Sequence, residues 1–439
     1  MDYVIDSTTE KLHSTGGIAL AGKIWERIQL GTDEVGKTLK HPHLLRVLAG
    51  LFVQGRTRYE EVSLVRSDSL FQESLELPYV PAPETLRLYL EQMIDQKETV
   101  QQAVEGANLR LLQRTRLTPV QGNGGRYLPL DIDTTVLDNS KSHKEGVSRT
   151  YKQVDGYHPI MSYMGQEGYM LSCELREGKQ HCQKGTPEYL RHTLSMAQKV
   201  SKGLPLLVRL DAGYDAQETL RVLQDSGQYF LVKRNPRKED PAVWLAVAQA
   251  EGQVVQQDDR KTVFVGVSSA GYPGREAPLR EARLVWEVTR TDRDEEGTPY
   301  LFPEISVQSF WTNLPEEPET VIQLYHEHGT SEQFHSELKG DMNIERLPSR
   351  KFAVNGMILQ VAMVAFNTLR FIGQRSVERE EVLPVPPTGF RKRLRKVMDD
   401  LVRVAVKVVQ HGRTTYLKLW AKDPWLLCFK QLYYLCCNL

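Results

Sequence analysis

The stretch from Gly125 to Arg234 alternates between strand-like and helix-like patterns, and this alternation constrains the fold more than any other feature of the sequence. Three strands are predicted first, in RYLPLDIDTTV, YHPIMSYMG and GYMLSCELREG, and the second and third form a hairpin around Gly165 and Gly168. A helix with a threonine cap follows in GTPEYLRHTLSMAQKVSKGL, then a strand in PLLVRLDAGYD, a helix in AQETLRVLQDSG and a strand in QYFLVKR. This order predicts an α/β core with one antiparallel hairpin and with parallel strands reached through crossover helices.

Acidic residues end two of the predicted strands. Asp133 follows LPLDI, and Asp211 follows LLVRL. Because sites in open α/β sheets form beyond the carboxyl ends of strands, both aspartates lie where chemistry is expected. Asp131 and Asp215 are near neighbours of these two. Asp133 is preferred because it directly precedes Thr134, and Asp211 because it closes the apolar strand.

The chain before about Arg116 is rich in short helix patterns separated by Pro and Gly, which suggests a small helical domain. Helix-turn-helix DNA readers show this texture, with Arg87 on the exposed side of a second helix as a possible phosphate or base contact. A plain helical bundle shows the same texture, so both interpretations stay open.

Residues 240–315 break the alternation with three β-type runs, KTVFVGVSS, EARLVWEVTRT and EISVQSFWTNL, and are predicted to form a β-rich insertion. Helical character then resumes. The apolar run from Val354 to Phe366 predicts a buried helix, because it falls short of the roughly 18 to 20 residues that span a bilayer.

A basic segment follows between Arg391 and Lys422, with ten Lys or Arg against two acidic residues. Its first residues, Arg391, Lys392 and Arg393, begin a predicted basic amphipathic helix that is followed by more basic strand or loop. This pattern suits a polyanion such as DNA, and its alternative is a solvated helix face. The whole chain has 56 basic and 56 acidic residues, so its net charge gives no general indication of a nucleic-acid partner.

The remaining bulk features indicate an ordinary cytoplasmic protein with no membrane association. Five cysteines include no C-x-x-C pair, which favours a reducing compartment. The first residues, MDYVIDSTTEKLHSTGG, lack the basic-then-apolar pattern of a secretory signal.

The segment LYHEHGTSEQFHSELKG, residues 324–340, contains three histidines and three glutamates. His328 and His335 are seven residues apart, about 10 Å along a helix, and His326 points elsewhere, so a three-histidine metal site is not predicted. We expect both His326 and His335 to be ordinary surface or packing residues. Helical spacing instead places four chemically different side chains on one stripe: Tyr325, His328, Glu332 and Lys339.

A carboxylate among groups that neutralise phosphate fits phosphoryl transfer better than a closed zinc site. Mg²⁺ prefers oxygen ligands, and two such ions can activate an attacking oxygen and stabilise a leaving one. Asp133, Asp211 and Glu332 could hold that pair if the helix packs across the strand ends.

These motifs resemble those of a known family. The pattern Y325-x2-H328-x3-E332-x6-K339 is similar to the Y-x2-R-x3-E-x6-K signature of DDE transposases from bacterial insertion sequences, which have a ribonuclease-H-like core. DIDTT and LDAGYD are similar to the first two catalytic aspartate motifs of that family. HKEGVSRTYKQVDGYHPIMSY resembles the group of elements numbered thirteen-eighty.

The resemblance implies a metal-dependent enzyme. Asp133, Asp211 and Glu332 would be catalytic and would bind two Mg²⁺ ions, for which Mn²⁺ would substitute. Tyr325 and Lys339 would hold the DNA of the transposon end.

One departure concerns His328, which stands where the family signature has Arg. Arg contacts phosphate bidentately at any pH, whereas a neutral imidazole offers one donor. Either His328 contacts phosphate more weakly, or Arg346 or Arg350 replaces it. In the insertion, Trp286 or Trp311 would stack on a flipped base, although a buried place on a strand is the simpler expectation for both.

The implied function is cut-and-paste DNA transposition, with cleavage at the inverted-repeat ends and joining of the freed 3′-hydroxyls to target DNA. The expected setting is a homodimeric synaptic complex in the bacterial cytoplasm, associated with the nucleoid. Two alternatives are a ribonuclease-H-like nuclease or resolvase, and a non-catalytic DNA-binding protein derived from a transposase. The basic C-terminal region and the long insertion favour the transposase over the nuclease.

The expected domain organisation has four regions. A helical, DNA-binding region covers residues 1–120, and a ribonuclease-H-like catalytic core covers 121–238 and 316–375. The β-rich insertion covers 239–315. The basic C-terminal region, for DNA binding or dimerisation, covers 376–439.

Overall fold

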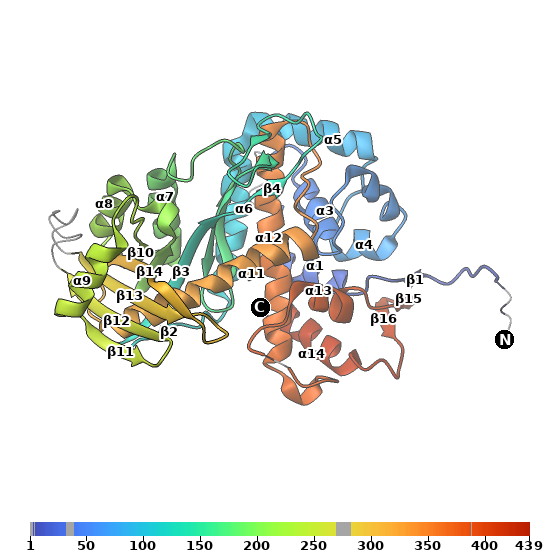
Figure 1. Ribbon diagram of the computed structural model, residues 1–439. Helices are drawn as coiled ribbons and strands as arrows, with labels where there is room; N and C mark the ends of the chain where they lie inside the picture. Colours follow the sequence, from blue (N-terminus) through green and yellow to red (C-terminus); the bar gives the residue numbers. More distant parts are fainter. Residues whose placement is uncertain (1–2, 4, 32–38, 269–281, 388) are drawn as a thin grey trace.

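A computed structural model of the chain describes residues 3, 5–31, 39–268, 282–387 and 389–439. A long sheet with its covering helices forms one half, and a group of N-terminal and C-terminal helices forms the other (Figure 1). Helix α12, Phe352–Val377, stands between the two halves. The cavity described below opens at the carboxyl ends of the central strands.

The centre of the sheet has the predicted mixed α/β character. Its strands are β3 (Arg126–Thr134), β7 (Ile160–Met164), β8 (Tyr169–Glu174), β9 (Leu206–Leu210) and β10 (Tyr229–Lys233). They run in the order β8-β7-β3-β9-β10. The β7–β8 hairpin is antiparallel and β7 is antiparallel to β3, whereas β9 is parallel to both β3 and β10. The sequence prediction of one hairpin and parallel crossover strands is therefore confirmed.

Two crossover helices connect the parallel strands, as predicted. Helix α7, Thr186–Val200, precedes β9, and helix α8, Gln217–Asp225, precedes β10. Thr186 is the first helical residue of α7 and not its cap, which is Gly185 in the left-handed conformation at φ +74°. The Thr186 hydroxyl instead donates to the Cys182 carbonyl at 2.5 Å.

The insertion continues the main sheet. It comprises α9 (Pro241–Glu251), β11 (Gln253–Gln257), β12 (Lys261–Ser268), β13 (Arg283–Arg293) and β14 (Pro299–Thr312). β14 pairs antiparallel with both β10 and β13, so the sheet extends in the order β11-β12-β13-β14-β10. The three predicted β runs form strands, α9 and β11 were not predicted, and residues 269–281 of the predicted insertion lie outside the described residues.

The N-terminal helices are α1 (Ile18–Arg27), α3 (His43–Phe52), α4 (Ser69–Ser74), α5 (Pro83–Gln92) and α6 (Lys97–Gln113). Apolar faces of α3 and α6 pack against α12. Buried polar contacts fix the register: Trp25 donates to Thr368 at 2.9 Å, and Asn367 donates to Asn108 at 2.7 Å. The N-terminal helices thus share one core with α12.

The C-terminal region packs against the beginning of the chain. A short helix, α13 (Leu394–Val397), leads into a π turn, Met398–Val402, and then into the hairpin of β15 (Val406–His411) and β16 (Thr414–Leu419). Strand β1, Leu12–His13, pairs with β15, and the last helix, α14 (Leu426–Cys437), contacts α1. The predicted basic amphipathic helix is therefore short, and strands carry the later basic residues, as expected for the strand or loop predicted after it.

The other elements are short. They are β2 (Val120–Gln121), the small sheet β4 (Leu137–Asp138), β6 (Asp155–Tyr157) and β5 (Ser148–Arg149), and the 3₁₀ turns Tyr59–Leu64, Met93–Gln96, Ala212–Tyr214 and Glu380–Val382.

Helix α12 fulfils the prediction of a buried apolar helix. It is long and apolar enough to cross a membrane by length and composition, but 78% of its most apolar window is buried inside the protein. Such burial is typical of the central helix of a folded core.

Candidate active site

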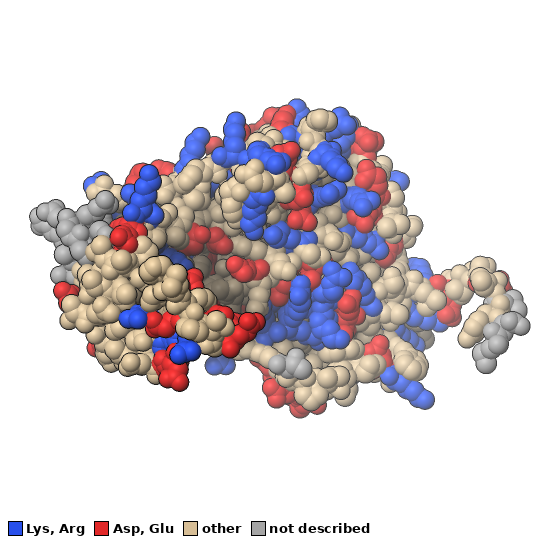
Figure 2. Space-filling model, in the orientation of Figure 1, with Lys and Arg blue, Asp and Glu red and all other residues tan. Residues whose placement is uncertain are grey.

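The carboxyl ends of β3 and β9 open into a cavity of about 830 Å³. Asp133, Asp211 and Glu332 all line it, although they are far apart in sequence. Figure 2 shows a hollow with acidic side chains at its rim, and basic side chains gathered beside it over the place where Figure 1 draws α13. The structure therefore brings the three predicted carboxylates to one cavity.

Strand register explains why the two aspartates share a face. Asp131 on β3 is the register partner of Arg209 on the parallel strand β9. Side chains two residues apart on a strand point to the same side of the sheet. Asp133 and Asp211, each two residues further along, therefore lie side by side above the Asp131–Arg209 pair.

The pair beneath the cavity is neutralised. Arg209 donates to both carboxylate oxygens of Asp131, at 2.6 and 2.8 Å, and His328 Nδ1 lies 3.0 Å from Asp131 Oδ1. Burial raises the pKa of Asp131, but Arg209 and His328 together outweigh burial and hold that pKa below its usual range. Asp131 is therefore a structural anion with its oxygens already in use.

Asp133 has the opposite electrostatic setting. Burial first, and then the charge of Asp211, raise the pKa of Asp133 to about 7. Burial also raises the pKa of Asp211, against a 2.9 Å hydrogen bond from the Gly213 amide. Two partly desolvated carboxylates with few donors favour a proton or a cation between them.

Asp215, the alternative to Asp211, faces a different pocket, which it lines together with Trp311. Its Oδ2 accepts from the Asn235 amide at 3.0 Å.

The segment carrying Glu332 is not one regular helix. It consists of α10 (Pro318–His326), a 3₁₀ turn (Glu327–Thr330), α11 (Ser331–Ser336) and a π turn (Glu337–Asp341). The changes of helical pitch break up the predicted stripe. Glu332 is exposed at the cavity, Tyr325 is half-buried with its ring against Phe310, and His328 is buried against Asp131.

Three of the residues predicted to hold DNA belong to this segment. Lys339 lines the cavity and its Nζ lies 3.1 Å from Thr135 Oγ1. Burial raises the pKa of Tyr325, followed by the charge of Asp211, so its phenol stays protonated. Because His328 is buried and bonded to Asp131, the geometry does not favour a phosphate contact for it.

His335 lies closer to the candidate site than the sequence suggested. The expected packing is present, against Tyr163 with ring centroids 5.4 Å apart. Its Nδ1 also lies 3.9 Å from Asp133 Oδ2, and its ring lines the cavity. Burial, followed by the charge of Lys339, lowers the pKa of His335 to about 3, so the imidazole is neutral. Its place three residues after Glu332 was the only sequence signal.

Sequence reasoning also missed the basic edge of the cavity. Arg149, Tyr151 and Lys152 line it, and all three are exposed. Arg149 ends strand β5, and the other two residues lie between β5 and β6. Their sequence, SRTYKQ, was noted only as part of the family resemblance, because no local sequence pattern indicates that these residues lie near Asp133.

The other predicted DNA contacts lie outside the cavity. Arg87 is bonded to Glu84 and Glu91 on its own helix, both at 3.0 Å, so its charge is largely satisfied. Trp286 and Trp311 are buried on strands, as the simpler expectation held. Arg346 and Arg350 are exposed. Three further residues, Arg391, Lys392 and Arg393, make ion pairs within the protein.

The donor set of the cavity fits a hard divalent cation. Carboxylate oxygens are the ligands that Mg²⁺ prefers, and the raised pKa of Asp133 beside Asp211 indicates a place where positive charge is favoured. Among the described residues, however, no group of three or more His, Cys, Asp or Glu lies close enough together to hold one ion. Asp133 and Asp211, at the ends of neighbouring strands, therefore form the candidate pair of ligands, and Glu332 lines the same cavity.

Comparison with known proteins matches the chain to a family model and to solved structures. Residues 24–435 match the family model described as transposase DDE domain group 1. Among solved structures, a cryo-electron microscopy structure of the piggyBac transposase synaptic complex with hairpin DNA is similar, at 11% identity and a TM-score of 0.44, covering 89% of this chain and 79% of that one. No curated protein sequence matches the chain.

Proposed function

The chain belongs to the family of DDE transposase domains of group 1, and from this premise we propose that it cleaves transposon-end DNA and joins the ends to target DNA. The observation that carries the proposal is the meeting of Asp133, Asp211 and Glu332 at one cavity. The strand order β8-β7-β3-β9-β10, with only β7 antiparallel to its neighbours β3 and β8, supports a ribonuclease-H-like core.

In this proposal Asp133 and Asp211 hold divalent cations, with Glu332 as the third carboxylate. Bound cations of this kind activate an attacking oxygen and stabilise a leaving one. The Asp131–Arg209 ion pair supports Asp133 over Asp131, because both oxygens of Asp131 are occupied. The amide of Thr134 donates to Asp133 Oδ1 at 2.7 Å and leaves the second oxygen facing His335.

The other cavity residues bind and orient the DNA. Lys339 reaches the cavity from the π turn and offers an ammonium to a phosphate. Lys152 offers a further cation at the edge, as does Arg149, which also pairs with Asp155 at 3.5 Å. Tyr151 offers a ring on which a base can stack. His335 is a neutral donor or acceptor beside Asp133.

The wider assembly follows from the same proposal. Inverted-repeat end DNA and target DNA are the partners, within a homodimeric synaptic complex in a bacterial cytoplasm. We further propose that the element belongs to the insertion sequences numbered thirteen-eighty, and that the basic C-terminal region helps to bind DNA. In this proposal His328, at the signature's Arg position, supports the site through its contact with Asp131 and does not bind phosphate.

The test is a cleavage and strand-transfer assay with the DNA that flanks this gene. We expect nicking at the element's ends with Mg²⁺ or Mn²⁺, no nicking with a chelator, and joined products when target DNA is added. Cleavage without any joining would support a nuclease instead. Binding of end DNA with neither reaction, in a preparation that folds normally, would support a non-catalytic DNA-binding protein.

A further inference from the structure

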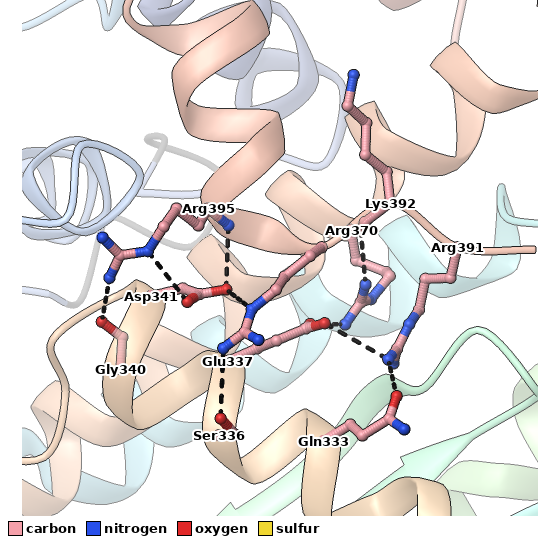
Figure 3. A network of polar contacts seen from close by, with 10 residues as sticks. Gln333, Ser336, Glu337, Gly340, Asp341, Arg370, Arg391, Lys392 and Arg395 are labelled. Carbon is pink, nitrogen blue, oxygen red and sulfur yellow. Dashed lines mark hydrogen bonds and ion pairs between the residues drawn. The ribbon is translucent and has the colours of Figure 1, made fainter. Parts of the chain in front are cut away.

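The segment that carries Glu332 has two faces with different tasks. Glu332, His335 and Lys339 line the cavity. A second face contacts α12 and the start of the basic C-terminal segment, and its residues are Gln333, Ser336, Glu337, Gly340 and Asp341 (Figure 3).

Glu337 is the inner attachment. Its carboxylate is 3% exposed and is paired with Arg370 of α12, which is fully buried. Arg391 lies on its other side, at 3.5 Å from Oε1. Arg391 also donates to Gln333 at 2.9 Å and lies over the Phe334 ring at 4.5 Å, so it contacts both residues that follow Glu332.

Asp341 is the outer attachment, one helical turn beyond Glu337. Its carboxylate is 2% exposed and accepts from Arg393 Nε at 2.9 Å and from the Arg395 amide at 3.1 Å. Arg395 also donates to the Gly340 carbonyl at 3.1 Å. The guanidinium groups of Arg393 and Arg395 remain more than half exposed.

Arg370 links the inner attachment to the segment that carries the outer one. Arg370 donates to the Lys392 carbonyl at 3.2 Å while it holds Glu337, so one buried side chain ties α12, the α11 segment and the C-terminal segment together. A buried ion pair is seldom more stabilising than apolar packing of the same volume, but it allows few orientations. This arrangement is therefore better suited to fixing direction than to adding stability.

We propose that Glu337 and Asp341 are positioning residues, held by Arg370, Arg391, Arg393 and Arg395, that orient α11 and the π turn so that Glu332 and Lys339 face the cavity. The inference rests on the proposed function for its catalytic consequence. It gives the first residues of the basic C-terminal segment a task beyond attracting DNA, because they complete the wall that carries the third carboxylate.

The experiment uses the full chain with Glu337→Gln and Asp341→Asn, tested singly. For each variant we would measure kcat and KM for end-DNA cleavage and the Mg²⁺ concentration that gives the half-maximal rate. We would also measure the hydrogen exchange of amides 331–341 in the absence of DNA. Because small displacements of a catalytic group are costly, we expect kcat to fall about tenfold or more. We also expect the required Mg²⁺ concentration to rise, exchange of these amides to quicken and KM for DNA to stay within about twofold, since no DNA-facing group is changed.

Two further variants separate positioning from charge and from general damage. Arg391→Lys keeps the positive charge but loses the planar fork that reaches both Gln333 and Glu337, so kcat should fall while KM changes little. Glu316 is buried at the other end of β3, where its carboxylate accepts hydrogen bonds from the Tyr127 hydroxyl at 2.7 Å and from the Gly124 amide at 2.9 Å. Glu316→Gln weakens these hydrogen bonds far from the cavity. Its Tm should fall, with kcat and Mg²⁺ dependence unchanged.

The outcomes are distinguishable. Wild-type kcat and Mg²⁺ dependence in Glu337→Gln and Asp341→Asn would overturn the inference, as would a rise in KM at constant kcat, which would mark a DNA contact. If Glu337→Gln does not fold, Arg395→Ala, whose side chain is more than half exposed, decides together with Asp341→Asn on the same readouts. If the wild-type chain cleaves no end DNA, the proposed function fails. Hydrogen exchange alone then tests the anchoring, and unchanged exchange in the variants overturns it.

Discussion

Asp131 and Asp133 lie two residues apart on the same side of strand β3, and their pKa values are shifted in opposite directions. Asp131 and its partner Arg209 form a lower layer, and Asp133 with Asp211 forms an upper layer. In the lower layer, Arg209 and His328 surround Asp131 and hold its pKa below its usual range. In the upper layer, the described residues place no Lys or Arg in an ion pair with Asp133 or Asp211, and His335, 3.9 Å from Asp133 Oδ2, is neutral. Burial, followed by the charge of Asp211, raises the pKa of Asp133 to about 7. The residue type and the strand are the same, so the difference comes entirely from the neighbours.

The comparison shows how a sheet can support a reactive edge. The lower ion pair joins β3 to β9 and, through the bond of Arg209 to the Leu324 carbonyl at 2.7 Å, also to α10. The strand ends that carry Asp133 and Asp211 are therefore held side by side by the Asp131–Arg209 pair, and no ion pair of their own is needed for this. Stability and reactivity are thus assigned to successive residues of one face.

The largest effect is expected from the upper layer. Asp133→Asn keeps the shape of the side chain but removes the charge that a cation would need, so cleavage of end DNA should fall by about three orders of magnitude or more. Binding of end DNA, measured by fluorescence anisotropy, should stay within a few-fold. Cleavage at the wild-type rate would remove Asp133 from the site and would erase the proposed distinction between the layers.

The next effect concerns the lower layer. Asp131→Asn leaves the buried Arg209 guanidinium without its anion, and breaking a buried pair in this way costs about 3 to 5 kcal/mol. Urea unfolding at pH 8 should show this loss of free energy of unfolding. Asp133→Asn is the matched control, because the same substitution two residues away removes no ion pair. Equal destabilisation by both variants would contradict the assignment of Asp131 to structure.

A smaller effect is expected in the pH dependence of stability. The folded-state pKa of Asp133, about 7, lies above its unfolded value, so the folded chain binds the extra proton. This contribution favours folding below about pH 4 and is lost as the pH rises towards 7, by roughly 1 to 4 kcal/mol. Asp133→Asn should therefore raise the free energy of unfolding at pH 8 relative to wild type. A pH profile identical in both proteins would show that Asp133 titrates normally.

The smallest effect is expected at His328. His328→Gln loses the 3.0 Å contact with Asp131 but leaves Arg209 in place, so the free energy of unfolding should fall by about 1 kcal/mol. DNA affinity should change less than about threefold, because the imidazole is buried. A tenfold loss of affinity at unchanged stability would instead indicate the phosphate contact that the family signature implies.

The sequence predicted the central strands, the β7–β8 hairpin and the three carboxylates of the cavity because each depends on local pattern. Asp133 and Asp211 close apolar strands, and Glu332 stands in a spaced motif. The pairing of Asp131 with Arg209 depends on parallel register between strands 78 positions apart, which periodicity does not encode.

Other features were hidden for related reasons. β14 joins the insertion to β10, a contact that exists only once the sheet has formed. Arg391 and Arg393 were predicted to contact DNA because their partners, Glu337 and Asp341, lie about fifty residues earlier. Arg87 is an exception: Glu84 and Glu91 lie three and four residues away on a predicted helix, so its neutralisation was readable from spacing.

The pairing of β1 with β15 and the packing of α3 and α6 on α12 also have a consequence for synthesis. The first hundred residues leave the ribosome with apolar faces whose partner, α12, begins only at Phe352. Contacts between residues so far apart in sequence form slowly, and the apolar faces promote aggregation as long as they remain exposed. The beginning of this chain can therefore reach its final structure only when nearly all of the chain has been made, and we expect truncated chains ending before α12 to be insoluble.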